Sequence, residues 1–197
     1  MAYPTVDAPY GLAPCNLIGG QAFAGSTRMI PIASGTATAI FYGDVVRLAA
    51  GVLVKDTGTA TATPVGVFLG CSYTDPVFGK TFRQAYPANT VAADIMAYVL
   101  DDPDALFKVA VVSSGTTIST VTRAAVGRNV PLVQNAGNAT TGNSRVAIST
   151  ATATTATLPI RVVDVVAETA TTGGTAFTEV VVKWNQGMHQ YLNATGV

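Results

Sequence analysis

The sequence predicts an all-β protein built from small β-barrel or β-sandwich lobes, and three observations point to this class. Short β-branched and aromatic runs alternate with Gly and Pro turns throughout residues 36–111. Glu and Lys, which favour exposed helix, are scarce, whereas Val and Thr abound. The chain also contains no helical stripe of apolar residues. Its 197 residues suffice for one large β domain or two small ones.

The first 26 residues are predicted to form an extended arm. Prolines recur in it every five residues and glycines interrupt it, so that extended backbone is favoured over regular elements. Its apolar content indicates that the arm lies along a neighbouring surface rather than free in solution. Four apolar side chains are candidates for that contact: Leu12, Leu17, Ile18 and Phe23. Removal of residues 1–26 is accordingly expected to leave a folded protein.

The first lobe is predicted to span residues 27–116. Apolar runs separated by turn residues indicate strands at 28–32, 39–48, 52–55, 64–71 and 82–86. Asp75 followed by Pro76 marks a further turn, because Asp can bond its own backbone and Pro fixes φ.

Two more elements are expected in this lobe: residues 92–100, which could form a strand or a helix, and a strand at 106–112. The first run is apolar on both faces, which suits a central strand of a sheet. The intervening residues 101–104 read Asp-Asp-Pro-Asp, which is a strong turn signal. We therefore expect these two strands to pair with each other as a hairpin.

The second lobe is predicted to span residues 117–197. A change to Ser, Thr and Gly at 113–125 marks the boundary. Further strands are indicated near 125–133 and at 144–148, 158–166 and 177–184. The Thr-Gly-Gly-Thr turn at 172–175 is expected to join the last two strands as a pair. The alternative is that both lobes pack as one domain.

Charge is unusually sparse. Charged residues make up 11% of the chain and the net charge is zero, whereas typical domains carry about 25% charged residues. A surface so poor in charge tends to be sticky unless partners cover it, which favours a component of an assembly. The alternative is that Thr, Ser, Asn and Gly supply polarity without charge. No basic tract is present, so direct nucleic-acid binding is not expected.

Acidic and thiol groups offer little chemistry. Asp101, Asp102 and Asp104 could hold a hard cation, but the glycine and the distal Glu of a calcium loop are missing, so a turn is preferred. Cys15 and Cys71 are far apart in the sequence and cannot be assigned as a disulfide.

Histidine and the aromatic residues offer no catalytic pattern either. His189 is the single histidine and lacks a nucleophile or metal partner at a useful spacing, so a surface or packing role is expected. Trp184, Tyr191 and Tyr98 could stack on sugars, but such residues are more often core or interface anchors. The sequence therefore predicts no catalytic, cofactor or metal site, and the chain is not expected to be an enzyme.

No membrane or export signal is recognised. The first residues lack a basic region followed by an apolar stretch, and no run of 18 apolar residues occurs. The protein is expected to be made, and kept or assembled, in the cytoplasm.

Several segments carry a resemblance to a known class of protein. They are residues 3–12 (Tyr-Pro-Thr-Val-Asp-Ala-Pro-Tyr-Gly-Leu), 16–20 (Asn-Leu-Ile-Gly-Gly), 40–46 (Ile-Phe-Tyr-Gly-Asp-Val-Val), 64–68, 101–103 and 183–185. Together they resemble virion structural proteins of tailed phages that infect marine bacteria. The succession Gly-Asp-Val-Val, Gly-Val-Leu-Val and Val-Gly-Val within residues 43–67 is similar to that of small-barrel capsid decoration, or cement, proteins.

This resemblance implies a phage capsid decoration protein that binds the outer surface of the major capsid protein lattice and stabilises the head. It implies a homo-oligomer, with a trimer favoured, located on the virion after assembly in the host cytoplasm. The arm would add a strand to the capsid, and its residues Leu12, Leu17, Ile18 and Phe23 would fill pockets there. The alternatives are another virion component (tail, neck, fibre base or small coat subunit) and a glycan-binding adhesion module.

Overall fold

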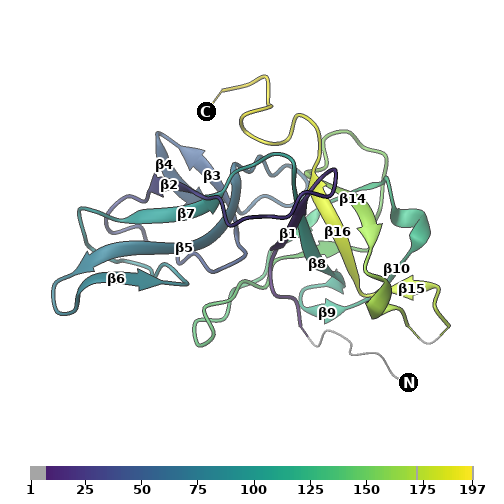
Figure 1. Ribbon diagram of the computed structural model, residues 1–197, viewed down its shortest axis with the longest axis horizontal. Helices are drawn as coiled ribbons and strands as arrows, with labels where there is room; N and C mark the ends of the chain where they lie inside the picture. The colour runs from purple at the N-terminus through teal and green to yellow at the C-terminus, as the bar shows by residue number, and fades with distance from the viewer. Residues whose placement is uncertain (1–7, 172, 197) are drawn as a thin grey trace.

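The protein is built almost entirely of β-strands, so the predicted all-β class is confirmed. The computed structural model describes residues 8–171 and 173–196, and the helical turns among these are two short 3₁₀ segments, Arg123–Ala125 and Ala167–Thr169. Figure 1 shows two lobes side by side. One contains β2 to β7, and the other contains β1 and the strands from β8 onward.

The first lobe is an antiparallel sheet in the order β2-β7-β5-β3-β4, with β6 added to β5. Its strands are β2 (Arg28–Pro31), β3 (Val45–Ala49), β4 (Val52–Lys55), β5 (Gly66–Asp75), β6 (Gly79–Arg83) and β7 (Met96–Leu100). Ala50 and Gly51 join β3 to β4, and both have positive φ, 48° and 81°. Positive φ at both positions is what a two-residue hairpin turn with the native twist requires.

The second lobe is centred on the ten-residue strand β8 (Ala105–Ser114). This strand pairs antiparallel with β1 (Ala13–Leu17), β9 (Thr117–Ile118) and β16 (Glu179–Trp184), and parallel with β13 (Ala147–Ser149). The sheet continues through β14 (Ile160–Val165) to β11 (Asn129–Val130) on one side, and to β12 (Leu132–Val133) on the other. A separate ribbon is formed by β10 (Val121–Thr122) and β15 (Ala176–Phe177).

The predicted pairing of the last two strands is confirmed. β14 and β16 run antiparallel, with Ile160 opposite Trp184 and Val162 opposite Val182. These four side chains are buried in the core, because alternate residues of a strand point to the same face. Phe107 of β8 packs on Trp184 with ring centroids 5.3 Å apart, so the aromatic pair fixes the middle of this core.

The hairpin expected at 94–112 does not form, and that prediction is wrong. β7 pairs with β2 and β5 in the first sheet, whereas β8 belongs to the second. Residues 101–104 do turn, with the Asp104 amide donating to Asp102 Oδ1 at 2.8 Å, but the turn carries the chain between lobes. The chain therefore passes from the first sheet to the second at residues 101–104 and not at 113–125. A strand that is apolar on both faces fits the centre of either sheet, so the pattern did not specify its partner.

Part of the N-terminal segment is extended, as expected. It lies against the second lobe of its own chain and not against another molecule. β1 pairs with β8, and Leu12 is fully buried in the core. The Tyr10 hydroxyl donates to the Glu179 carboxylate on β16. Pro14 lies opposite Phe107 on an edge strand, where its missing N–H is tolerated. Removing residues 1–26 would therefore strip a strand and a core side chain from the second lobe. Residues 1–7 of the predicted arm lie outside the described residues.

The apolar cores of the two lobes meet. Val45, Val67 and Leu100 of the first sheet belong to the same buried cluster as the core of the second. Polar contacts reinforce the junction: the Leu132 amide donates to the Thr59 carbonyl at 3.1 Å, and the Gln190 amide donates to the Pro64 carbonyl at 2.8 Å. The fold therefore holds the two sheets against each other through both apolar and hydrogen-bonded contacts.

Candidate interaction surface

The four residues proposed for partner contact lie in different environments. Leu12 is 0% exposed, so its side chain cannot reach a partner. Leu17 and Phe23 are partly buried against the second lobe's core. Ile18 is 47% exposed, just beyond the end of β1. Of the four, Ile18 has the surface that a contact needs, and Leu12 is corrected to a core residue.

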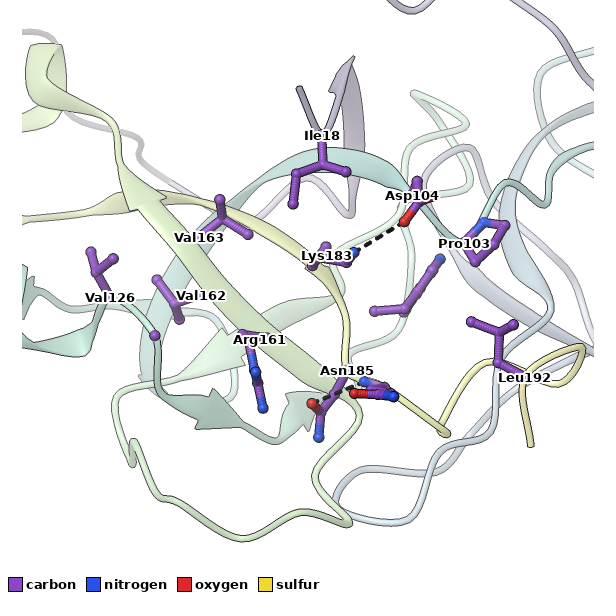
Figure 2. Close-up of a pocket in the computed structure, with 13 residues that line it drawn as sticks. Ile18, Pro103, Asp104, Val126, Arg161, Val162, Val163, Lys183, Asn185 and Leu192 are labelled. Carbon is purple, nitrogen blue, oxygen red and sulfur yellow. Dashed lines mark hydrogen bonds and ion pairs between the residues drawn. The ribbon is translucent and has the colours of Figure 1, made fainter. Parts of the chain in front are cut away.

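Ile18 lies at a hollow of about 570 Å³ on the outer side of β14 and β16. Figure 2 shows the lining side chains, which include Leu192 of the C-terminal segment and the ion pair of Lys183 with Asp104, 3.2 Å apart. The Ile18 amide donates to the Asp104 carbonyl at 3.0 Å, which fixes this part of the chain. Ile18 and Leu192 give the hollow exposed apolar surface, and the Lys183–Asp104 ion pair and Arg161 give it charged groups, so the hollow suits a contact that is partly apolar and partly polar.

Among the described residues, three of the four most exposed large apolar side chains lie on the β5–β6 hairpin, and the fourth is Val91. Val77, Phe78 and Phe82 are 78%, 77% and 70% exposed. The turn that carries them is fixed locally, because Asp75 Oδ1 accepts the Val77 amide at 2.8 Å and the Phe78 amide at 3.1 Å. These two hydrogen bonds hold the pKa of Asp75 below its usual value. The predicted turn at Asp75 and Pro76 is confirmed.

The outer face of the first sheet continues this apolar surface. Phe82, Ser72 and Met96 form one cross-strand row, and the next row brings Tyr98 beside Met29. Phe82 stacks on Tyr98 with ring centroids 6.5 Å apart. Met29, Phe82 and Met96 are exposed, whereas the opposite face of the same sheet is buried in the first lobe's core. Exposed apolar surface of this kind is a candidate interaction site.

His189 is a buried packing residue. Its side chain is fully buried between Trp184 and Tyr191, with ring centroids 6.5 Å and 5.3 Å away. Its Nδ1 accepts the Tyr191 amide at 3.3 Å. Burial lowers the pKa of His189, so the imidazole is neutral in the folded protein at pH 7. No nucleophile is hydrogen-bonded to it in the described part of the chain, so His189 has no partner there to activate.

The cysteines are free and lie in different lobes. Cys71 on β5 is buried, and burial raises the pKa of its thiol to about 11. Cys15 on β1 is half-buried, and its thiol donates to the Leu106 carbonyl at 3.3 Å.

The three aspartates in the turn between the lobes form ion pairs and a hydrogen bond within the fold. Asp101 pairs with Arg28 at 2.7 Å, Asp104 pairs with Lys183, and Asp102 closes the turn. Within residues 8–171 and 173–196, no group of three or more His, Cys, Asp or Glu side chains is placed to hold a metal ion. The arrangement is therefore that of a turn and two ion pairs.

Of the three aromatic residues considered for stacking on sugars, Trp184, which has the largest ring, is not accessible. Trp184 is buried against Phe107 and has no exposed face for a sugar to stack on. Tyr191 is exposed but packs beneath the Arg28 guanidinium, 4.9 Å from its ring centroid. Trp184 is thus a core anchor, the role that such residues more often have.

Sequence reasoning missed the hairpin side chains Val77, Phe78 and Phe82. A signal was present, since two large apolar residues stand inside a turn that begins Asp-Pro and ends at Gly79. Turn positions are normally polar and exposed, so apolar residues there indicate an interaction.

Comparison with protein-family models, with curated proteins and with solved structures found no match for this chain. None of the helical segments among the described residues has the length and apolar character needed to cross a membrane.

Proposed function

We propose that this protein is a structural component of a phage virion, and specifically a capsid decoration, or cement, protein on the outer surface of the major capsid protein lattice. One observation carries the proposal: a β protein with 11% charged residues leaves large apolar side chains exposed on the hairpin and on the adjoining sheet face. Such a surface is sticky unless partners cover it. The sequence resemblance supplies the identity of that partner.

The mechanism is multivalent attachment. Each copy contributes a small apolar contact, and an oligomer, with a trimer favoured, makes several contacts at once, so that weak interfaces add up to stable attachment. Contact with capsid subunits would brace the head. The hollow at Ile18 and Leu192 is the proposed capsid-facing site. Of the four arm residues expected from the sequence to contact the capsid, Ile18 is the well-exposed one, and it lies at this hollow. Direct contact with nucleic acid is not part of this role.

The test is binding to capsids that lack the protein, followed by pelleting and imaging. Regularly spaced, stoichiometric density on the outer capsid surface is the expected result. Ile18→Glu replaces the exposed apolar side chain at the hollow with a charged one and is expected to reduce co-pelleting at least tenfold. Thr154→Glu, at an exposed loop position in the same lobe, is the matched control and should bind as the unmodified protein does.

Two results would contradict the proposal. Failure to co-pellet with capsids, with density found at the tail, neck or fibre base instead, would assign another virion role. Failure to bind any virion part, together with binding in a glycan screen, would favour an adhesion module. Retained capsid binding by Ile18→Glu would leave decoration standing and move the contact away from this hollow.

A further inference from the structure

The first lobe leaves a sheet edge open along β6, which follows the hairpin tip, residues 76–78. Strands β2 and β4, at the two ends of the main strand order, are in contact with each other, so these two edges shield one another. β6 pairs with β5 on one side, and Figure 1 shows no strand of the described residues beyond it. Four of its five residues are exposed, so the edge is accessible from outside.

The backbone groups on the outer side of β6 have no partner in another segment. Successive residues of a strand direct their N–H and C=O groups to opposite sides, so an edge strand leaves one of these two sets unpaired. Beyond the ladder with β5, the bond that reaches the backbone of residues 79–83 within the described part of the chain is local. It runs from the Thr81 hydroxyl to the Gly79 carbonyl, at 3.1 Å. The edge can therefore accept the hydrogen bonds of a further strand.

The usual protections of an open edge are missing from β6. Proteins blunt such edges with a Pro, with a bulge that twists the strand away, or with charged side chains. Residues 79–83 contain no Pro, and their pairing with β5 has no register shift. Charge is then the protection that remains to be considered.

The two charged side chains of β6 turn back over the sheet and not out across the edge. The Lys80 ammonium pairs with Asp94 at 2.9 Å, and Asp94 in turn accepts the hydroxyl of Thr74 on β5 at 2.7 Å. The Arg83 guanidinium lies over the ring of Tyr73, also on β5, 6.0 Å from its centroid. Neither charge therefore blocks a strand that approaches the edge.

The β6 strand of a second copy meets the requirements of this edge. An antiparallel partner needs an unpaired edge of its own and must not place like charges opposite each other. With a two-fold axis at Thr81, Lys80 lies opposite Phe82 of the second copy, and Gly79 lies opposite Arg83 of the second copy. All five residues are then paired and no like charges face each other. The chain has zero net charge, so two copies do not repel each other overall.

The neighbouring registers are worse. A two-fold axis at Lys80 would put two ammonium groups opposite each other, which destabilises a strand pair. An axis at Phe82 would leave three residues of β6 paired in place of five. The charges and the length of the strand therefore select the axis at Thr81.

We propose that β6 of one copy pairs antiparallel with β6 of a second copy about a two-fold axis at Thr81, which joins the two first-lobe sheets into one continuous sheet. The contact is isologous, so it closes as a dimer and uses both open edges. It lies on the first lobe, whereas the proposed capsid-facing hollow lies beside β14 and β16, so one copy can use both. The inference goes beyond the proposed function and does not depend on it. In a cement layer, this contact would join neighbouring oligomers.

Disulfide trapping tests the contact in solution, without capsids. Residues directly opposite each other on antiparallel strands have Cα atoms about 4.5–5.5 Å apart, which a disulfide can span. Thr81→Cys, in a Cys15→Ser background that removes the more accessible native thiol, is therefore expected to form a disulfide-linked dimer under mild oxidation. Thr74→Cys is the matched control, because Thr74 is exposed on β5 of the same hairpin. In the proposed dimer its two copies are at least about 14 Å apart across the sheet. Thr81→Cys should dimerise at least tenfold faster.

A mixture of two variants tests the register. Lys80→Cys and Phe82→Cys, in the same background, place thiols on residues that lie opposite each other in the proposed pair. Two copies of either variant alone place their thiols on a diagonal, about 7–8 Å apart, which is too far for an unstrained disulfide. The mixed disulfide should therefore exceed each homodimer at least fivefold in mass spectrometry. Circular dichroism and melting temperature confirm that each variant is folded.

Three results would overturn the proposal: no disulfide-linked dimer of Thr81→Cys, equally fast dimerisation of Thr74→Cys, or a mixture without an excess of the mixed disulfide. The capsid experiment has an independent readout. Capsid binding by a protein that fails the trapping test would overturn the strand pairing and leave decoration standing. Trapped dimers in the expected register, without capsid binding, would overturn decoration and leave the strand pairing standing.

Discussion

Ser144 donates a 2.6 Å hydrogen bond from its hydroxyl to Oδ1 of Asp44, joining the second lobe to the first. Asp44 is fully buried, and its Oδ2 accepts the Phe41 amide at 2.9 Å and the Lys55 ammonium at 2.8 Å. Every bond to this carboxylate comes from a different segment. A buried charge is tolerated only when hydrogen bonds and a counter-charge satisfy it. The folded state is therefore stable only when the segments that carry the partners of Asp44 are held in these positions.

Replacement of Lys55 by Met is expected to destabilise the protein by about 3–5 kcal/mol, because it leaves the Asp44 carboxylate buried without a counter-charge. Urea unfolding followed by circular dichroism measures this change. The matched control is Lys80→Met, which breaks the ion pair with Asp94, where both side chains are about half exposed. Solvent screening makes such pairs weak, so the control should change stability far less. Equal effects of the two substitutions would contradict the structural role of Asp44.

Leu12→Ala is expected to cost about 2–5 kcal/mol of unfolding free energy, since it opens a cavity in a closed core. Leu12 is fully buried, and its amide donates to the Gly43 carbonyl at 3.0 Å. Ile18→Ala, six residues later at an exposed site, should stay within about 0.5 kcal/mol of the unmodified protein. Thermal and urea unfolding of both variants provide the measurement. A negligible effect at Leu12 would mean that the segment is not part of the core.

The predictions made from local sequence succeeded where pairing is local. The sequence predicts β14 and β16 as partners because two Val-rich runs flank a Gly-Gly turn, and consecutive strands often pair. In the structure the connection between them also contains the 3₁₀ segment Ala167–Thr169 and β15, which pairs with β10. The same reasoning failed for β7 and β8. Their connection at Asp101 to Asp104 is a good turn in either arrangement, and the choice of sheet depends on β2, β5 and β16, which are distant in the sequence.

The candidate surface was less accessible to sequence reasoning. Leu12 and Ile18 lie in one Pro- and Gly-rich segment without a strand or helix period, so nothing local separates the buried residue from the exposed one. The position of Leu12 depends on β1 pairing with β8, some 90 residues away. The hairpin tip could have been found, because an apolar pair inside an Asp-Pro turn has no local reason to be apolar.

Stability is expected to fall between pH 7 and pH 5 because of His189. Burial lowers its pKa in the folded protein, whereas the unfolded chain has the ordinary value of about 6.5. Below that pH the unfolded state takes up a proton that the folded state does not, so stability is lost as the pH falls, with a limiting slope of about 1.4 kcal/mol per pH unit.

His189 is the chain's single histidine, so few other groups titrate in this range. His189→Gln should flatten the dependence of the unfolding free energy on pH from 7 to 5, whatever its effect on stability at pH 7. Urea unfolding at several pH values measures the slope. The same slope in both proteins would show that another group is responsible.

The two thiols are expected to react at very different rates. The thiolate is the reactive form, and a thiol with a pKa of about 11 is only about 0.1% ionised at pH 8. Cys71 is also buried within β5, whereas Cys15 is half-buried on the edge strand β1. Iodoacetamide at pH 8 should therefore modify Cys15 at least tenfold faster than Cys71 in the folded protein. Peptide mass spectrometry over time gives both rates, and unfolding in urea should abolish the difference. Equal rates in the folded protein would contradict the burial of Cys71.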